Sequence, residues 1–114
     1  LKKYLPGPYT FILPSNKVLP RPFKKRKTVG IRIPKHPVVL EIVKQLGNPI
    51  ITTSIHDNDA IIEYTTDPDV IFEDWRSKVD IVIDSGFGGN IPSTVIDTCQ
   101  EPPLVTRSGA GEFN

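Results

Sequence analysis

The chain has 114 residues and a formal net charge of +1, a length that suits one domain. Apolar residues make up 38% of it, as in ordinary globular proteins, and no apolar run reaches the roughly 18 residues that a membrane-spanning helix needs. Cys99 is the single cysteine, which excludes an internal disulfide and favours a reducing compartment. We therefore expect a cytoplasmic protein.

The first half of the sequence predicts two short strands and a helix. Tyr9–Leu13 is a β-branched and aromatic run between prolines, and Thr28–Ile33 is a second such run. Pro37 suits the first position of a helix, and apolar residues recur at helical spacing from there to Leu46. Gly47 then fits a left-handed cap at the end of this helix.

The second half predicts one more helix and several strands. Asp67 is typical of an N-cap and Pro68 of a first helical turn, so a helix is expected from Pro68 to about Arg76. The expected strands are Ile50–Thr53, Val79–Asp84, Thr94–Asp97 and Leu104–Thr106. Among these, Val79–Asp84 has the pattern of a strand that is buried on both faces. The sequence thus predicts an α/β (α+β) fold with a mixed sheet.

Charge is distributed unevenly along the chain. Of the 14 Lys and Arg residues, ten precede Glu41, whereas all 13 Asp and Glu residues lie from Glu41 onward. A basic segment of this kind attracts phosphate on a nucleotide or on RNA. Internal pairing between the basic and acidic parts is an equally good interpretation, and the run Lys24–Lys27 alone is more typical of a solvated loop.

The chain contains no methionine, although a natural translation product begins with one. We therefore expect residues 1–114 to be part of a longer protein. A sheet that lacks some of its strands exposes an unpaired edge and apolar surface. Self-association through such an edge is a further expectation.

Five segments resemble, in order, the YrdC/YciO family and its YciO-like branch. They are PGPYTFIL from Pro6, KTVGIRIPKHPV from Lys27, NPIITTS from Asn48, IDSGFGGNIPSTVID from Ile83 and LVTRSGAGEF from Leu104. Each segment alone is weak, but together they cover nearly the whole chain. The resemblance implies a twisted mixed sheet around a positively charged pocket. Residues 1–114 would be the carboxyl-terminal part of a single domain of this type, without the amino-terminal half that carries the Lys-x-Arg nucleotide motif.

The resemblance also implies a function. Members of the family join ATP, bicarbonate and threonine into threonylcarbamoyl-adenylate, an intermediate of tRNA modification. This chain would belong to a nucleotide-binding protein related to L-threonylcarbamoyladenylate synthase, with ATP, with or without magnesium, and L-threonine as ligands. We expect the fragment alone to be inactive, so that any nucleotidyltransferase activity belongs to the full-length protein. A non-catalytic module that binds double-stranded RNA or tRNA is the alternative.

By the same resemblance, six residues are expected to contact ligands. The nucleotide contacts are Thr10, Ser54 and Arg107, and the substrate contacts are Arg32, Thr53 and Ser93. Hydroxyl groups can donate or accept hydrogen bonds, and a guanidinium binds carboxylate or phosphate through two parallel ones. The family pattern at Ser54 is Ser-Ala-Asn, and His56 occupies the position of its asparagine. This replacement resembles the YciO-like branch of the family. We predict no catalytic residue in this chain.

Two of these residues have a structural interpretation as well. Thr10 could be an ordinary strand threonine. Arg32 alternates with Ile31 and Ile33, so it would face a cavity or solvent if both isoleucines enter the core. A metal site at His56 is not expected, because its acidic neighbours share one loop without helical spacing.

Overall fold

The computed structural model describes residues 1–15, 25–56 and 65–114. Within it the chain forms two compact units. The first unit consists of Leu1–Glu41 and Pro92–Asn114, and the second consists of Ile42–Ile91. The two ends of the chain therefore belong to the same unit.

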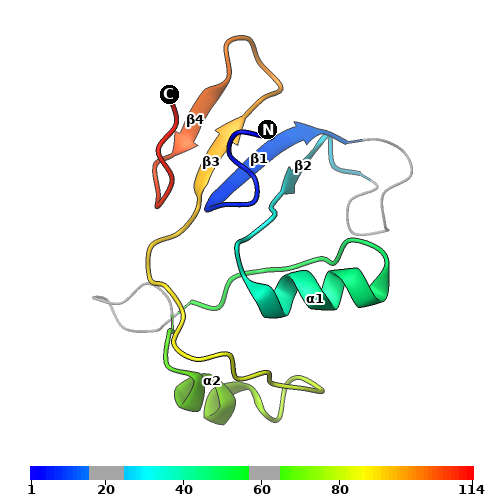
Figure 1. Cartoon of the computed structure of the whole chain (residues 1–114), viewed down its shortest axis with the longest axis vertical. Coiled ribbons are helices and arrows are strands. Elements are labelled where there is room, and N and C mark those ends of the chain that lie inside the picture. Colours follow the sequence, from blue (N-terminus) through cyan, green and yellow to red (C-terminus); the bar gives the residue numbers. More distant parts are fainter. Residues whose placement is uncertain (16–24, 57–64) are drawn as a thin grey trace. The chain divides into compact units, whose positions relative to one another are not determined.

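The first unit contains a four-stranded mixed sheet (Figure 1). Its strands are β1 (Tyr9–Pro14), β2 (Thr28–Ile31), β3 (Thr94–Asp97) and β4 (Leu104–Arg107), in the order β2-β1-β3-β4. Strand β1 pairs antiparallel with β2 and parallel with β3, while β3 pairs antiparallel with β4. These pairings confirm the predicted α/β class and its mixed sheet.

The register of the central strands gives the sheet two chemically different faces. Phe11 pairs directly with Ile96, and their side chains are only 2% and 0% exposed. Because alternate residues of a strand share a face, Thr94 joins this apolar face. Thr10 and its partner Val95 lie on the opposite face.

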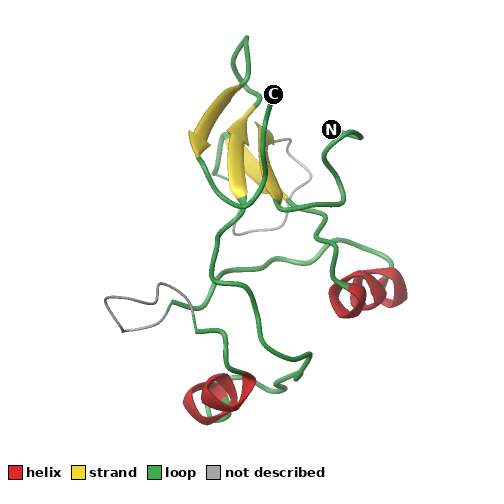
Figure 2. Ribbon diagram, turned by 60° about the vertical axis from the view of Figure 1, so that its left-hand side comes forward, coloured by secondary structure: helices red, strands yellow, loops and turns green. Residues whose placement is uncertain are grey.

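Both ends of the chain cover the apolar face. The ring of Tyr4 lies 5.0 Å from the rings of Tyr9 and Phe113. The hydroxyl of Tyr9 donates to the carbonyl of Glu112 at 2.6 Å, and that of Tyr4 donates to the carbonyl of Asn114 at 3.1 Å. Figure 2 shows the segment after β4 running back along the sheet.

Two helices follow the signals read from the sequence. Helix α1 (Pro37–Leu46) ends before Gly47, whose φ of 83° is the predicted left-handed cap. Helix α2 (Pro68–Trp75) begins after Asp67, whose carboxylate accepts a hydrogen bond from the N–H of Asp69 at 2.9 Å. In the part of the chain that the structure describes, no helix has the length and apolar character needed to cross a bilayer.

Two predicted strands are wrong. Neither Ile50–Thr53 nor Val79–Asp84 is a strand in the structure, and Ile51, Ile81 and Ile83 are 56%, 75% and 56% exposed. A strand needs a neighbour whose backbone accepts and donates its hydrogen bonds. Among the described residues, no neighbouring strand pairs with either segment. The sequence pattern indicates that these segments prefer an extended backbone. It does not indicate whether a neighbouring strand is present to pair with them.

Candidate ligand site at the start of β1 and β3

Three of the six predicted contact residues meet directly. The hydroxyl oxygens of Thr10 and Ser93 are 2.7 Å apart. The Nε and Nη2 atoms of Arg107 donate to the carbonyl oxygen of Ser93 at 3.1 and 2.8 Å, and Nη2 also donates to the Ser93 hydroxyl at 3.1 Å. We call Thr10, Ser93 and Arg107 the hydroxyl–guanidinium cluster.

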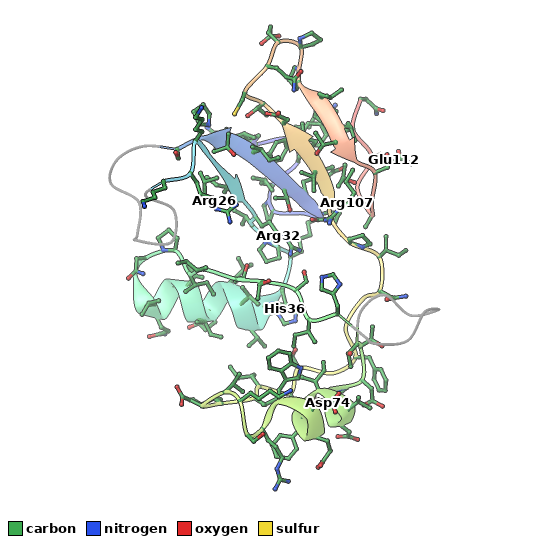
Figure 3. All side chains as sticks on the ribbon, turned by 180° about the vertical axis from the view of Figure 1, so that it is seen from behind. Arg26, Arg32, His36, Asp74, Arg107 and Glu112 are labelled. Atoms are coloured by element: carbon green, nitrogen blue, oxygen red, sulfur yellow. The ribbon has the colours of Figure 1, made fainter. Side chains whose placement is uncertain are left out.

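The register of the sheet explains why these residues meet. Val95 pairs with Thr10 on one side and with Arg107 on the other, and directly paired residues point to the same face. Ser93 precedes Val95 by two positions, so its side chain emerges on that face too. Figure 3 shows Arg107 beside the start of the central strands. The cluster therefore lies on the face opposite Phe11.

The cluster combines a buried hydroxyl with an exposed positive charge. Ser93 is 8% exposed, whereas Arg107 is exposed. No carboxylate among the described residues forms an ion pair with Arg107. Its three hydrogen bonds to Ser93 use Nε and Nη2, so the Nη1 group makes none of them. This group can bind an oxygen of a phosphate or a carboxylate.

Thr94 holds the backbone that follows Arg107, a role that the sequence interpretation missed. Its side chain is 2% exposed, and its hydroxyl donates to the carbonyl of Gly111 at 2.6 Å. The same oxygen accepts from the N–H groups of Gly109 at 3.1 Å and Gly111 at 3.0 Å. The adjacent Ser-Thr pair was the available signal, because alternation sends one hydroxyl to each face of the sheet.

Among the other predicted contact residues, Arg32 shares the first unit with the cluster but does not join it. Arg32 is exposed and follows β2 directly, and Figure 3 places it next to the sheet. It makes no hydrogen bond or ion pair with the residues that the structure describes. Thr53 and Ser54 are exposed and belong to the second unit.

The sequence predicts that Arg32 faces a cavity or solvent if Ile31 and Ile33 both enter the core, and the structure does not meet this condition. Its neighbours Ile31 and Ile33 are 39% and 41% exposed, so neither is a core residue. Strand β2 ends at Ile31, and the strict alternation of a strand does not extend to Arg32. Its exposure, and not a buried pair of neighbours, makes its guanidinium accessible.

The described residues contain no group of three or more His, Cys, Asp and Glu side chains that could hold a metal ion. His56 is described and exposed. Asp57 and Asp59 lie outside the described residues, as does Lys24 of the basic run.

Residues 1–109 match the model of the Sua5/YciO/YrdC family, which carries the description "Telomere recombination". The chain belongs to this family. It is 39% identical over 115 residues to an uncharacterised protein of Haemophilus influenzae and 38% identical over 115 residues to YciO of Escherichia coli. It is also 32% identical over 110 residues to the threonylcarbamoyl-AMP synthase of Pyrococcus abyssi, covering 95% of this chain and 32% of the synthase.

Solved structures of family members agree with this fold. The crystal structure of E. coli YciO matches 97% of this chain with a TM-score of 0.87 and 37% identity. P. abyssi Sua5 in complex with L-threonine matches 95% of it with a TM-score of 0.80 and 32% identity.

The chain spans about half the length of the YciO-type relatives. Its matched region is 55% of the H. influenzae protein and 55% of E. coli YciO, so each relative contains a further segment of similar size.

Proposed function

We propose that this chain is the part of a YciO/YrdC-type protein that binds ATP and L-threonine, related to threonylcarbamoyl-AMP synthase. The observation that carries the proposal is the hydroxyl–guanidinium cluster. It joins a buried serine and a half-buried threonine hydroxyl to an arginine without a carboxylate partner among the described residues. The relationship to a threonylcarbamoyl-AMP synthase and to a Sua5 structure that contains L-threonine supports this choice of ligands.

The guanidinium and the two hydroxyl groups of the cluster have different tasks in this proposal. The Nη1 group of Arg107 donates to a phosphate oxygen of ATP, with or without magnesium, and Thr10 forms a hydrogen bond to the same ligand. Ser93 is expected from the sequence to contact the substrate; because it is hydrogen-bonded to both Thr10 and Arg107, we propose that it contributes to ATP binding instead. Arg32, whose guanidinium makes no bond to the described residues, binds the carboxylate of L-threonine. The contacts from Thr53 and Ser54 stay predictions.

We expect ligand binding, but no synthesis, from the 114-residue chain. Joining ATP, bicarbonate and threonine requires all three reactants to be positioned together, and the relatives named as synthases contain much more polypeptide than this chain matches. Synthesis is therefore a property proposed for a longer polypeptide.

The experiment that tests the proposal is a titration of the chain with ATP and with L-threonine. Binding is monitored by amide NMR and by calorimetry. ATP is expected to shift the amide signals of Thr10, Ser93 and Arg107. Ser93→Ala should weaken ATP binding by about tenfold, as expected for one hydrogen bond to a charged group. Thr106→Ala is the matched control, because among the described residues its hydroxyl forms a hydrogen bond only to the Val95 carbonyl, at 3.4 Å.

The proposal fails if ATP shifts none of these amide signals. It fails equally if Ser93→Ala and Thr106→Ala weaken binding to the same extent, because the loss would then not depend on the cluster.

Binding of RNA is the second candidate function, and one observation favours it. The described basic residues before Glu41 are all exposed and form no ion pair with a described residue. They are Lys2, Lys3, Lys25, Arg26, Lys27, Arg32 and Lys35. None of these charges is therefore held in an ion pair with a described carboxylate.

Binding that depends on phosphate contacts weakens steeply as salt concentration rises. Fluorescence anisotropy with a labelled RNA duplex should therefore show a steep salt dependence, and replacing Lys25, Arg26 and Lys27 with alanine should reduce it. The double variant Lys44→Ala/Lys78→Ala removes charge outside the basic segment and is the control. An unchanged salt dependence in the triple variant would remove this candidate.

A further inference from the structure

The pairing of β3 with β4 shifts by one residue just before Arg107. Val105 pairs with Ile96, but the next residue of β3, Val95, pairs with Arg107 and not with Thr106. Two residues of β4 therefore correspond to a single step along β3, which is the pattern of a β-bulge with Thr106 as the extra residue. A bulge changes the direction in which the side chain after it points.

This shift decides which face of the sheet carries the guanidinium of Arg107. If the register of Val105 and Ile96 continued, Arg107 would pair with Thr94. The side chain of Thr94 lies on the apolar face, opposite Ser93, and directly paired residues share a face. A slip of one residue moves a side chain to the other face of the sheet. The hydroxyl–guanidinium cluster therefore depends on the shifted register.

The hydroxyl of Thr94 fastens the chain shortly after the bulge. It donates to the carbonyl of Gly111 at 2.6 Å and accepts from the N–H groups of Gly109 and Gly111 at 3.1 and 3.0 Å. One hydroxyl offers one proton and two lone pairs, so its hydrogen-bonding capacity is fully used. The N–H of Ala110 adds a hydrogen bond to the carbonyl of Pro92 at 2.9 Å. The segment after β4 is thereby bound to the start of β3.

The contact between these two segments is too close for a side chain. A Cβ at Gly109 would collide with the backbone of Pro92 and Ser93, so a glycine is required for this approach. Gly109 follows Arg107 by two positions. Because two residues span only a few ångströms, holding Gly109 in place limits how far the backbone of Arg107 can move.

The chain after Thr106 thus holds the start of β3 from both faces of the sheet. On one face, Arg107 donates to the carbonyl and the hydroxyl of Ser93. On the other face, Gly109 donates to Thr94, the neighbour of Ser93. Loss of the second contact leaves the strand pairing and the bonds of Arg107 itself as the remaining restraints on the guanidinium.

We propose that Thr94 is a positioning residue for anion binding by Arg107. Its hydroxyl keeps the end of β4 in the shifted register and so holds the guanidinium against Ser93, which leaves the Nη1 group for the ligand. Thr94 acts through Arg107 and touches no ligand of the cluster, because its side chain is 2% exposed and lies on the opposite face. The effect of Thr94 on affinity rests on the ATP binding proposed above, whereas its effect on the geometry of Arg107 does not.

The experiment measures solvent exchange of the Arg107 Nε–H by NMR and ATP affinity by calorimetry. The Nε–H donates to the carbonyl of Ser93, so its proton should exchange slowly in the folded chain. Thr94→Val should speed this exchange by at least about tenfold and weaken ATP binding by about tenfold. Thr94→Ser keeps the hydroxyl and should restore both properties to within about twofold of the original chain.

Thr98→Val is the matched control at the other end of β3. The Thr98 hydroxyl donates to the carbonyl of Ile12 at 2.7 Å, so the same substitution removes a hydrogen bond that does not involve the segment after β4. It should change Nε–H exchange and ATP affinity by less than about twofold. All variants are compared under conditions in which amide protection of Phe11 and Ile96 shows that the first unit is folded.

The unsubstituted chain provides a second test, which does not require Thr94→Val to fold. Native-state exchange at low urea concentrations reports which groups open together. The amides of Gly109 and Gly111 and the Nε–H of Arg107 should exchange through one shared opening, with the same dependence on urea. If the Nε–H opens independently of the two glycine amides, the hydroxyl of Thr94 does not position Arg107 and the proposal is overturned.

Four further results would overturn it. They are unchanged Nε–H exchange in Thr94→Val, weaker ATP binding without faster exchange, equal effects of Thr94→Val and Thr98→Val, and a Thr94→Ser variant that behaves like the valine variant. A different result separates this inference from the proposed function. If Thr94→Val speeds Nε–H exchange and Thr94→Ser restores it, but the unsubstituted chain binds no ATP, the positioning of Arg107 is supported and the proposed function fails.

Discussion

The guanidinium of Arg107 holds Ser93 from two directions. Two of its nitrogens donate to the carbonyl oxygen of Ser93, at 3.1 and 2.8 Å, and one of them also donates to its hydroxyl at 3.1 Å. The side chain at the end of β4 thereby fixes both the backbone and the hydroxyl of the residue that precedes β3. The planar fork of arginine suits this arrangement, whereas a lysine ammonium cannot reproduce it.

Arg107→Lys should lower the free energy of unfolding by about 1–2 kcal/mol, the range for lost hydrogen bonds to a charged group. Urea denaturation followed by circular dichroism measures the change. Arg76→Lys is the control, because the ion pair of Arg76 with Glu73 is long, at 3.8 Å, and exposed, and should change stability by less than about 0.5 kcal/mol. Equal losses of stability in the two variants would show that the hydrogen bonds from the Arg107 guanidinium to Ser93 do not stabilise the fold.

Thr94→Val should destabilise the first unit by about 2–4 kcal/mol, because it leaves the N–H groups of Gly109 and Gly111 without their acceptor. Thr94→Ser keeps the hydroxyl and should cost about 1 kcal/mol for the lost methyl group. Thermal and urea unfolding compare the two variants. A serine variant as unstable as the valine variant would assign the role of Thr94 to packing instead of hydrogen bonding.

Gly47→Ala should destabilise the end of α1 by about 1 kcal/mol, because the φ of 83° is strained for a residue with a side chain. A Cβ at Gly47 would meet no atom within 4 Å, so backbone strain is the only cost. Gly89→Ala is the matched control: a Cβ there also meets nothing within 4 Å, and the φ of Gly89 is not positive. Hydrogen exchange of the last turn of α1 measures the effect, and similar results for both variants would contradict it.

The Asp97 carboxylate makes stability depend on pH. The N–H of Cys99, at 2.8 Å, and then the amide of Gln100, at 3.1 Å, hold the pKa of Asp97 below its usual value of 3.8. The unfolded chain binds the proton more readily, so this contribution is present above the usual pKa and is lost as pH falls through the lowered value. Asp97→Asn should therefore reduce stability at neutral pH and have no such effect in strong acid. A pH-independent difference in urea unfolding would refute this.

The same carboxylate affects the thiol of Cys99. Desolvation, and then the neighbouring Asp97, raise the pKa of Cys99 above its ordinary value of 9.0. Since the thiolate is the reactive form, alkylation by iodoacetamide near neutral pH should be slower for the folded chain than for a short cysteine peptide. Asp97→Asn should make alkylation faster, because it removes both the hydrogen bond and the negative charge by which Asp97 raises the pKa of Cys99. Unchanged kinetics in this variant would leave desolvation as the only cause.

Local structure could be predicted from the sequence because its causes are local. The N-cap at Asp67 and the left-handed glycine at Gly47 each depend on a few neighbouring residues, and both helices begin at the predicted proline. The strands around Phe11 and Ile96 were also predicted, because β-branched and aromatic runs between turns prefer extended backbone. The family was predicted from short segments in the right order.

The tertiary structure decided which residues meet and which segments remain without a partner. Thr10 and Ser93 are 83 residues apart in sequence, and their contact depends on the register between β1 and β3, which no local pattern specifies. Likewise, Val79–Asp84 has the pattern of a buried strand, but all of its side chains except half-buried Val82 are exposed, and no described strand pairs with it. A residue carries its own preference for extended backbone, whereas pairing and burial depend on a second segment that must be present.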